Sequence, residues 1–171
     1  MTPAGEEVAV PIEVVWVALG VVILVGSLLA SRSDRARIAA RVATALLFIP
    51  AGALYNLAHL LGGDDYSGFA DSSSSAFVRE TWQSLVVPHH TFFIGLLVAF
   101  ETAVGVLVLL GGRWTRVGLV AAIVFHVALL SFGWIYLPWA VIAVMSFSLQ
   151  LRAERRAPRR VRSSGPGTME A

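Results

Sequence analysis

An acidic residue, Glu101, lies near the middle of the apolar stretch FFIGLLVAFETAVGVLVLLGG, which runs from Phe92 to Gly112. Ionising a carboxyl group in hydrocarbon costs at least about 2.5 kcal/mol, so a buried acid is expected to be paired, protonated or used in chemistry. Glu101 precedes Trp114 by 13 residues, and His126 follows Trp114 by 12 residues. A helical hairpin turning near Trp114 would place the two side chains at nearly equal depth, offset by about 1.5 Å of helix rise. We therefore expect His126 to be the partner of Glu101.

Two interpretations of this expected pair stay open. A carboxyl group and an imidazole at hydrogen-bond distance can share a proton inside the bundle, which would suit proton or ligand handling. Alternatively, Glu101 stays protonated and only holds two helices together, while His126 is neutral and packed. Interhelical polar contacts of that kind are worth about 0.6 to 2 kcal/mol, which is enough to fix packing without any chemistry.

The segment before this hairpin carries its own polar residues at helical spacing. Arg41, Tyr55 and Asn56 recur with small residues at steps of three and four, which predicts one polar face of a helix. Lipid cannot satisfy the hydrogen bonds of such side chains, so that face must point toward other helices or a water-filled cavity. The candidate buried polar site consists of five residues: Arg41, Tyr55, Asn56, Glu101 and His126.

A second polar group flanks the same apolar segments on their other side. It contains three histidines and two carboxylates: His59, Asp64, Asp65, His89 and His90. Such side chains can ligate a divalent metal, and two facing histidines can hold haem iron. Their spacing matches no defined ligand motif, so we predict no metal here, and neither haem nor another resident cofactor is expected.

Composition places these residues in a membrane. Of 171 residues, 57% are hydrophobic and 14% are charged, and there is no cysteine for disulfides or thiolate metal sites. Runs of membrane-spanning length predict an all-α integral membrane protein, a helical bundle. The expected spans are Ile12–Ala30, Ile38–Leu61, Thr91–Leu110, Val117–Phe132 and Ile135–Leu151.

Arginine placement decides between four and five spans. All 13 basic residues are arginines. If a break around Gly133 divides the last apolar run into two spans, 12 arginines lie on one side of the membrane and only Arg79 lies on the other. Cytoplasmic loops are enriched in basic residues, so we expect a multi-pass cell-membrane protein with its N-terminus outside and its C-terminus in the cytoplasm. The arginines flank apolar segments without interleaved stacking aromatics, so no nucleic-acid partner is expected, and membrane lipid is the expected contact.

The remaining segments complete the expected organisation. Residues 1–37 form an N-terminal anchor span and an arginine-rich turn; the start is acidic rather than basic, so the span is expected to be retained rather than cleaved as a signal peptide. Residues 38–151 form the core, with a long outer loop at 62–90 whose second half places Val78 and Trp82 on one face of a short surface helix ended by Pro88. Residues 152–171 are expected to be a disordered basic cytoplasmic tail.

The stretches RVATALLFIPAGALYNLAHLL and PHHTFFIGLLVAFETAVGVLVLLGGRWTRVGLVAAIVFHVALL together resemble the DoxX-like family of small integral membrane proteins. The parallels are Arg41 opening the first core helix, Gly52 within it, and a second helix carrying Glu101, Gly105 and then Leu109 to Gly112. The resemblance covers about residues 38–151 and implies a four-helix core with both ends cytoplasmic. The first span and the long outer loop are additions to that outline.

The resemblance implies a link to redox chemistry, because family members are associated with quinone-linked oxidoreductases and with membrane complexes of oxidative-stress defence. The first hypothesis is a non-catalytic subunit or anchor of such a complex, with a protein partner in the membrane. The second is a quinone-interacting oxidoreductase subunit that uses a buried Glu101–His126 pair, with quinone as its ligand. A third and weaker hypothesis is a small transporter.

Overall fold

The computed structural model describes residues 11–156, and these residues form helices and short turns without a strand. Five helical segments are long and apolar enough to cross a membrane, which confirms the predicted all-helical fold with five segments of spanning length and is consistent with a membrane protein. They are α1 (Ile12–Leu29); α2 (Asp34–Phe48) continued by η1 (Ile49–Leu54) and α3 (Tyr55–Leu61); α5 (His90–Leu110); α6 (Gly112–Leu129); and α7 (Leu137–Arg156).

Short elements connect these spans. The outer loop contains α4 (Ala76–Thr81), followed by η2 (Trp82–Val86) and η3 (Val87–His89). The turn between α6 and α7 contains η4 (Leu130–Phe132) and η5 (Trp134–Tyr136). Gly133 separates these two turns with a φ of +132°, a conformation that L side chains rarely adopt. The predicted break at Gly133 is therefore confirmed.

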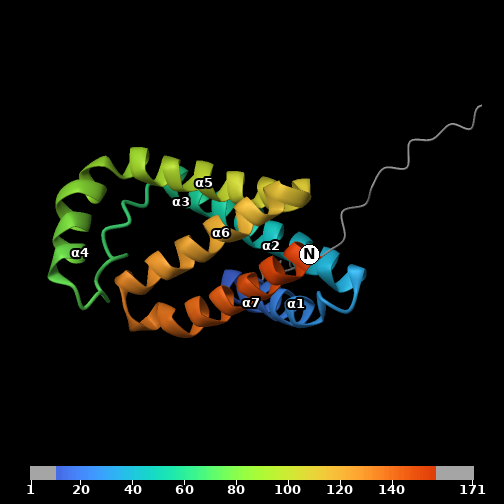
Figure 1. Cartoon of the computed structure of the whole chain (residues 1–171). Helices are drawn as coiled ribbons and strands as arrows, with labels where there is room; N and C mark the ends of the chain where they lie inside the picture. The colour runs from blue at the N-terminus through green and yellow to red at the C-terminus, as the bar shows by residue number, and fades with distance from the viewer. Residues whose placement is uncertain (1–10, 157–171) are drawn as a thin grey trace, which may run out of the picture.

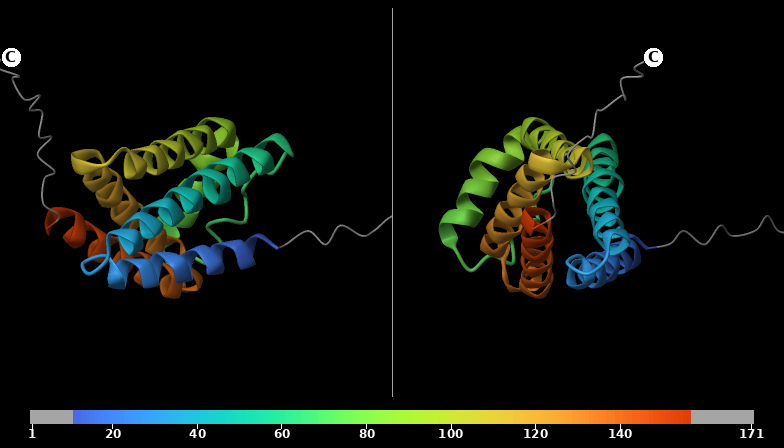
Figure 2. Two further views of the ribbon diagram at one scale, coloured as in Figure 1. Left: turned by 90° about the vertical axis from the view of Figure 1, so that its right-hand side faces the viewer. Right: turned by 45° about the vertical axis from the view of Figure 1, so that its right-hand side comes forward.

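The spans form a ring of neighbours (Figures 1 and 2). Each span packs against the next in the chain, and α7 returns to pack against α1. The helix that the sequence suggested as an addition to a four-helix core thus lies between α2 and α7. Small residues allow this close approach: a side chain at Gly26 of α1 would lie 2.9 Å from the Cβ of Ala40 in α2.

The interior of the ring is filled by apolar side chains from every span. The buried cluster includes Ile23 of α1, Phe48 of α2, Val104 of α5, Leu119 of α6 and Phe147 of α7. The outward faces remain apolar and exposed, as expected for helices surrounded by lipid.

Two ends of the bundle differ in charge. The end where α1 meets α2, α5 meets α6 and α7 terminates, here called the arginine end, carries nine of the described arginines: Arg32, Arg35, Arg37, Arg41, Arg113, Arg116, Arg152, Arg155 and Arg156. The opposite end, called the loop end, carries the outer loop, with α4 lying across the ends of the spans in Figure 1. Arg79 of α4 lies at this end.

The structure corrects four boundaries. α2 begins at Asp34 rather than at Ile38, because the Ser33 side chain accepts from the Ala36 backbone N–H and caps the helix there. α6 begins at Gly112 rather than at Val117, and α7 runs to Arg156 rather than ending at Leu151. The extra turn of α7 is stabilised because Ala153 is buried and Glu154 lies within 3.6 Å of Arg37. Pro88 does not end the helical segment either, because η3 continues through it into α5 and the chain bends there. The rest of the predicted tail, 157–171, lies outside the described residues.

Candidate functional site

Glu101 is buried, with 6% of its surface exposed, and its nearest polar partner is Asn56. The Asn56 side-chain amide Nδ2 donates a hydrogen bond to Glu101 Oε2 at 3.0 Å. This contact joins α3 to α5 across the interior of the bundle. Two residues of the predicted buried site are therefore in direct contact.

The backbone opposite Glu101 is a π-helix, η1, which contains Pro50 and Gly52. A Cβ atom placed at Gly52 would lie 2.8 Å from Glu101 Oε1. The carboxyl group thus occupies space that a side chain at position 52 would need. Single turns of π-helix inside α-helices are frequently found at functional sites.

Asn56 is also connected to the outer loop. The Tyr66 hydroxyl donates to the backbone carbonyl of Asn56 at 2.8 Å and lies 3.5 Å from Asn56 Oδ1. Tyr66, Asn56 and Glu101 therefore form a hydrogen-bonded row from the loop end to a buried carboxyl group. We call this row the outer polar row.

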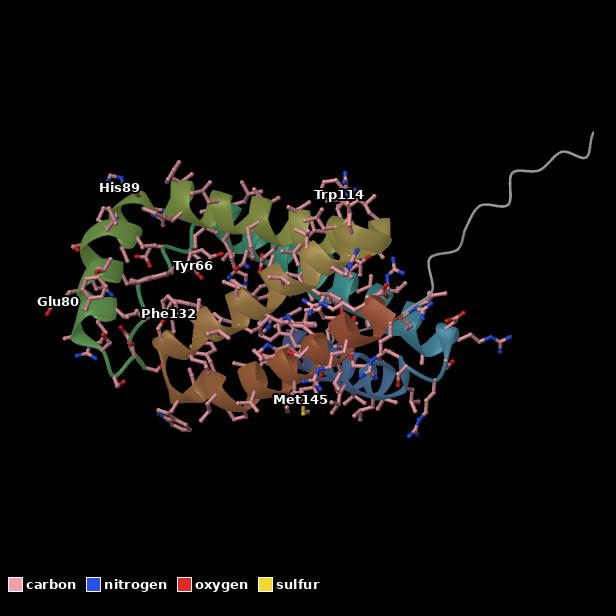
Figure 3. The ribbon with its side chains drawn as sticks, viewed as in Figure 1. Tyr66, Glu80, His89, Trp114, Phe132 and Met145 are labelled. Carbon is pink, nitrogen blue, oxygen red and sulfur yellow. The ribbon has the colours of Figure 1, made fainter. Side chains whose placement is uncertain are left out.

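Tyr66 itself is held in place by the loop around it. Trp82 Nε1 donates to the Tyr66 carbonyl at 2.8 Å, and Asp64 Oδ1 accepts from the Tyr66 backbone N–H at 2.7 Å. Figure 3 shows Tyr66 and Phe132 on the bundle side of α4, while Glu80 and His89 point away from it. Burial, together with the charge of Asp64, raises the pKa of Tyr66 to about 12. Its hydroxyl is therefore a hydrogen-bond donor throughout the physiological pH range.

Tyr55 lies beside the row rather than within it. Its ring packs edge-on against Trp16 of α1, with 5.5 Å between ring centroids, and lies 4.3 Å from the ring of His59. Trp16 Nε1 donates to the carbonyl of Ala51 in η1 at 2.8 Å. The first span is thereby fixed directly to the π-helical turn.

His126 does not form the hydrogen bond to Glu101 that the sequence suggested. Its Nδ1 lies 2.9 Å from the carbonyl of Ala122, one turn earlier in α6. Its ring is surrounded by aromatic side chains, with Phe147 at 5.3 Å and Phe48 at 5.9 Å between centroids. Equal spacing from Trp114 predicts depth but not the direction in which each side chain leaves its helix, and here the directions differ.

Arg41 is also separate from the outer polar row. Its Nε and Nη2 donate to the carbonyls of Val108 and Leu109, each at 3.2 Å, near the end of α5. Val108 lies two helical turns beyond Glu101, or about 10 Å along the axis. Arg41 Nη1 lies 3.8 Å from Glu154 Oε1. Arg41 therefore belongs to the arginine end, and the five predicted residues do not form one site.

The outer histidines and carboxylates are likewise spread out. His59 Nδ1 lies 3.3 Å from Asp64 Oδ2, and both side chains are exposed. His90 Nδ1 instead lies 2.9 Å from the carbonyl of Val87. The Ser67 backbone N–H donates to Asp65, which lowers the pKa of that carboxyl group. Within residues 11–156 no three His, Asp or Glu side chains are grouped as metal ligands would be.

Three residues important to this arrangement were not identified from the sequence. Tyr66 and Trp82 were assigned to an outer loop and a surface helix, and Glu154 to a disordered tail. Only the aromatic residues in an otherwise polar loop could have signalled Tyr66 and Trp82. The arginines that surround Glu154 follow from the three-dimensional arrangement of α2 and α7.

Comparison of the chain with protein-family models, curated proteins and solved structures finds no match.

Proposed function

We propose that this protein is a DoxX-like, non-catalytic membrane subunit that anchors a redox or oxidative-stress complex. One observation supports the proposal: buried polar side chains make hydrogen bonds from one span to another. Asn56 joins α3 to α5, and Gln150 Nε2 of α7 donates to Thr44 Oγ1 of α2 at 3.2 Å. Thr115 Oγ1 of α6 donates to the Val108 carbonyl of α5 at 2.8 Å. Side chains used in this way hold the spans in register.

The filled interior agrees with a structural subunit. The cavity between α1 and α7 near Trp139 and Ser146 holds only about 10 Å³, which is the space of about one water molecule. A quinone ring would need this seam to open. We also propose that the arginine end faces the cytoplasm and the loop end faces outward, following the positive-inside rule.

The outer polar row favours a second candidate, a quinone-interacting oxidoreductase subunit. Reduction of a quinone to a quinol takes up two electrons and two protons. A protonatable Glu101 joined by Asn56 and Tyr66 to the loop end could exchange a proton with that side. In this function the electrons would come from a redox partner. The transporter hypothesis has no comparable observation in its favour.

Substitution of Glu101 separates the two candidates. In the anchor function, Glu101→Gln keeps the contact with Asn56, so thermal stability should change little, whereas Glu101→Leu should cost about 0.6 to 2 kcal/mol. In the anchor function, the Glu101 carboxyl group does not titrate. Infrared spectroscopy of the purified wild type should then show no titrating carboxyl band that disappears in Glu101→Gln. Glu80→Gln, at an exposed position, is the matched control.

The partner is tested in native membranes. Mild solubilisation should retain the chain in a stoichiometric complex with a flavin-, haem- or iron–sulfur-containing subunit, and Glu101→Gln should leave that complex intact. Isolation of the chain without such a partner would contradict the anchor function. A titrating Glu101 band combined with stoichiometric quinone in the lipid extract would favour the second candidate.

A further inference from the structure

A depression of about 490 Å³ lies at the arginine end, between the α1–α2 turn and the last turn of α7. Its polar lining comes from Ser31, Arg32, Ser33, Asp34, Arg37 and Arg156. Three guanidinium groups, two from the α1–α2 turn and the start of α2 and one from the end of α7, thus border one space. The outer polar row is at the other end of the bundle and takes no part in it.

The charges around this depression are not balanced. Arg37 forms ion pairs with two acidic residues: its Nη2 lies 2.8 Å from Asp34 Oδ1, and its Nε lies 3.6 Å from Glu154 Oε1. Arg32 and Arg156 are exposed and form no ion pair with any acid within residues 11–156. The depression therefore has two free guanidinium groups beside two serines. Guanidinium groups bind phosphate oxygens through paired hydrogen bonds.

The same pair of helices continues away from this depression toward the bilayer centre. There the α1–α7 seam is apolar and closely packed, with a small crevice lined by Gly20, Ile23, Trp139, Ile142 and Ser146, among others. Ala30, directly after α1, lies seven positions beyond Ile23, and Ala153 of α7 lies seven positions beyond Ser146. Each step is about 10 Å along the helix axis. The α1–α7 seam thus offers a basic site at its membrane-surface end and an apolar surface toward the bilayer centre.

We propose that the α1–α7 seam binds an anionic phospholipid, with its phosphate at Arg32 and Arg156 and one acyl chain against the exposed apolar side chains of α1 and α7, among them Ile142. A free phosphate ion would use only the basic part of the seam. Basic pockets between spans on the cytoplasmic side are suited to acidic lipid headgroups. The bound lipid would also cover the contact between α1 and α7, the contact that closes the ring.

The test uses the full chain in neutral detergent and native mass spectrometry with defined lipids. Phosphatidylglycerol should bind more tightly than phosphatidylcholine with the same acyl chains. The double variant Arg32→Gln/Arg156→Gln should lose about 30-fold in phosphatidylglycerol affinity, from about 1 kcal/mol for each arginine. The control Arg113→Gln/Arg116→Gln removes two arginines from the α5–α6 turn at the same end and should retain wild-type affinity.

Several outcomes would overturn the proposal. Equal loss in both double variants would mean that general surface charge attracts the lipid, and equal binding of phosphatidylcholine would exclude headgroup recognition. The site would belong to a soluble anion if equimolar inorganic phosphate displaced phosphatidylglycerol. The same conclusion would follow if lengthening the acyl chains from eight to sixteen carbons gave no gain in affinity. The variant Arg32→Lys/Arg156→Lys keeps both charges and should still bind phosphatidylglycerol. Wild-type circular dichroism of this lysine variant and of the glutamine variant would exclude misfolding as the cause of lost binding.

Discussion

At the scale of single residues, Glu101 shows how backbone geometry makes room for a buried polar group. Pro50 has no N–H and cannot make a regular helical hydrogen bond, and the chain around it adopts the wider π-helical turn η1. Gly52 in that turn adds no side chain, so the Glu101 carboxyl group lies directly against the backbone. Gly52 and Glu101 are therefore matched in shape, because a side chain at position 52 would take the space of the carboxyl group.

Gly52→Ala should therefore destabilise the protein. The added Cβ would lie 2.8 Å from Glu101 Oε1, so the carboxyl group must move and weaken its contact with Asn56. Overpacking of this size typically costs about 1 to 3 kcal/mol, measurable as earlier thermal unfolding in detergent. Gly95→Ala in α5 is the matched control, because a Cβ there meets nothing within 4 Å. Equal melting temperatures for the two variants would contradict this account.

Tyr66 predicts a specific response to alkaline pH. Its pKa is raised from 10 to about 12 in the folded protein, chiefly by burial. The stabilisation linked to this phenol is therefore fully present below pH 10 and is lost as the pH rises through about 12. Deprotonation removes the O–H that donates to the Asn56 carbonyl.

Tyr66→Phe has no phenol to ionise, so its stability should fall less steeply than that of the wild type between pH 10 and 12. Thermal unfolding across this range measures the two slopes, and ultraviolet absorbance of tyrosinate should show that the variant lacks a late-titrating group. Parallel slopes for wild type and variant would show that Tyr66 is not linked to folding.

At the scale of elements, the outer loop is tied to the turn between α6 and α7. Ser72 Oγ donates to the Phe132 carbonyl at 2.7 Å, and Ser73 Oγ donates to the Ser131 carbonyl at 2.6 Å. Phe69 stacks on Trp82 and packs edge-on against Phe132, each with 5.0 Å between ring centroids. These contacts hold Tyr66 where its hydroxyl reaches Asn56.

Trp82→Ala should release the loop without unfolding the spans. It removes the indole donor to the Tyr66 carbonyl and a ring that packs against both Phe69 and Phe132. Local opening should then become easier, so backbone amides of residues 66–75 should exchange hydrogen at least about tenfold faster. Phe77→Ala in neighbouring α4 is the control, since that ring is 76% exposed. Unchanged exchange in the Trp82 variant would mean that the serine contacts alone hold the loop.

The sequence predicted elements better than it predicted their contacts. Hydropathy and the arginine distribution located five spans, because both depend on the bilayer and hardly on neighbouring helices. Glu101 was recognised as a buried acid for the same reason. Its partner was not, because the choice of Asn56 over His126 depends on the rotation of α5 and α6 about their axes. The last turn of α7 was missed because Glu154 gains its arginine neighbours only when α2 and α7 pack together.

At the scale of the whole molecule, α1 completes the ring rather than standing apart from it. It contacts α2 through Gly26, η1 through Trp16, and α7 at Gly20, where a Cβ would lie 2.8 Å from the Trp139 ring. The five spans run in alternating directions, so the first and last described residues, Pro11 and Arg156, lie at opposite ends of the bundle. The outer polar row and the proposed lipid site then lie at opposite ends of the bundle, so a proton exchanged at one end would not meet a lipid bound at the other.

Reporter fusions can test this arrangement in cells. Fusions after Gly63 and after Arg162 should report opposite sides of the membrane, with the second in the cytoplasm, because nine described arginines lie at the end where α7 terminates. A fusion after Ser31, in the α1–α2 turn, should report the same side as the fusion after Arg162 and serves as the internal control. If the fusions after Gly63 and Arg162 report the same side, α6 and α7 do not both cross the bilayer. The break at Gly133 would then be a kink within one span, and the seam between α1 and α7 could not form as described.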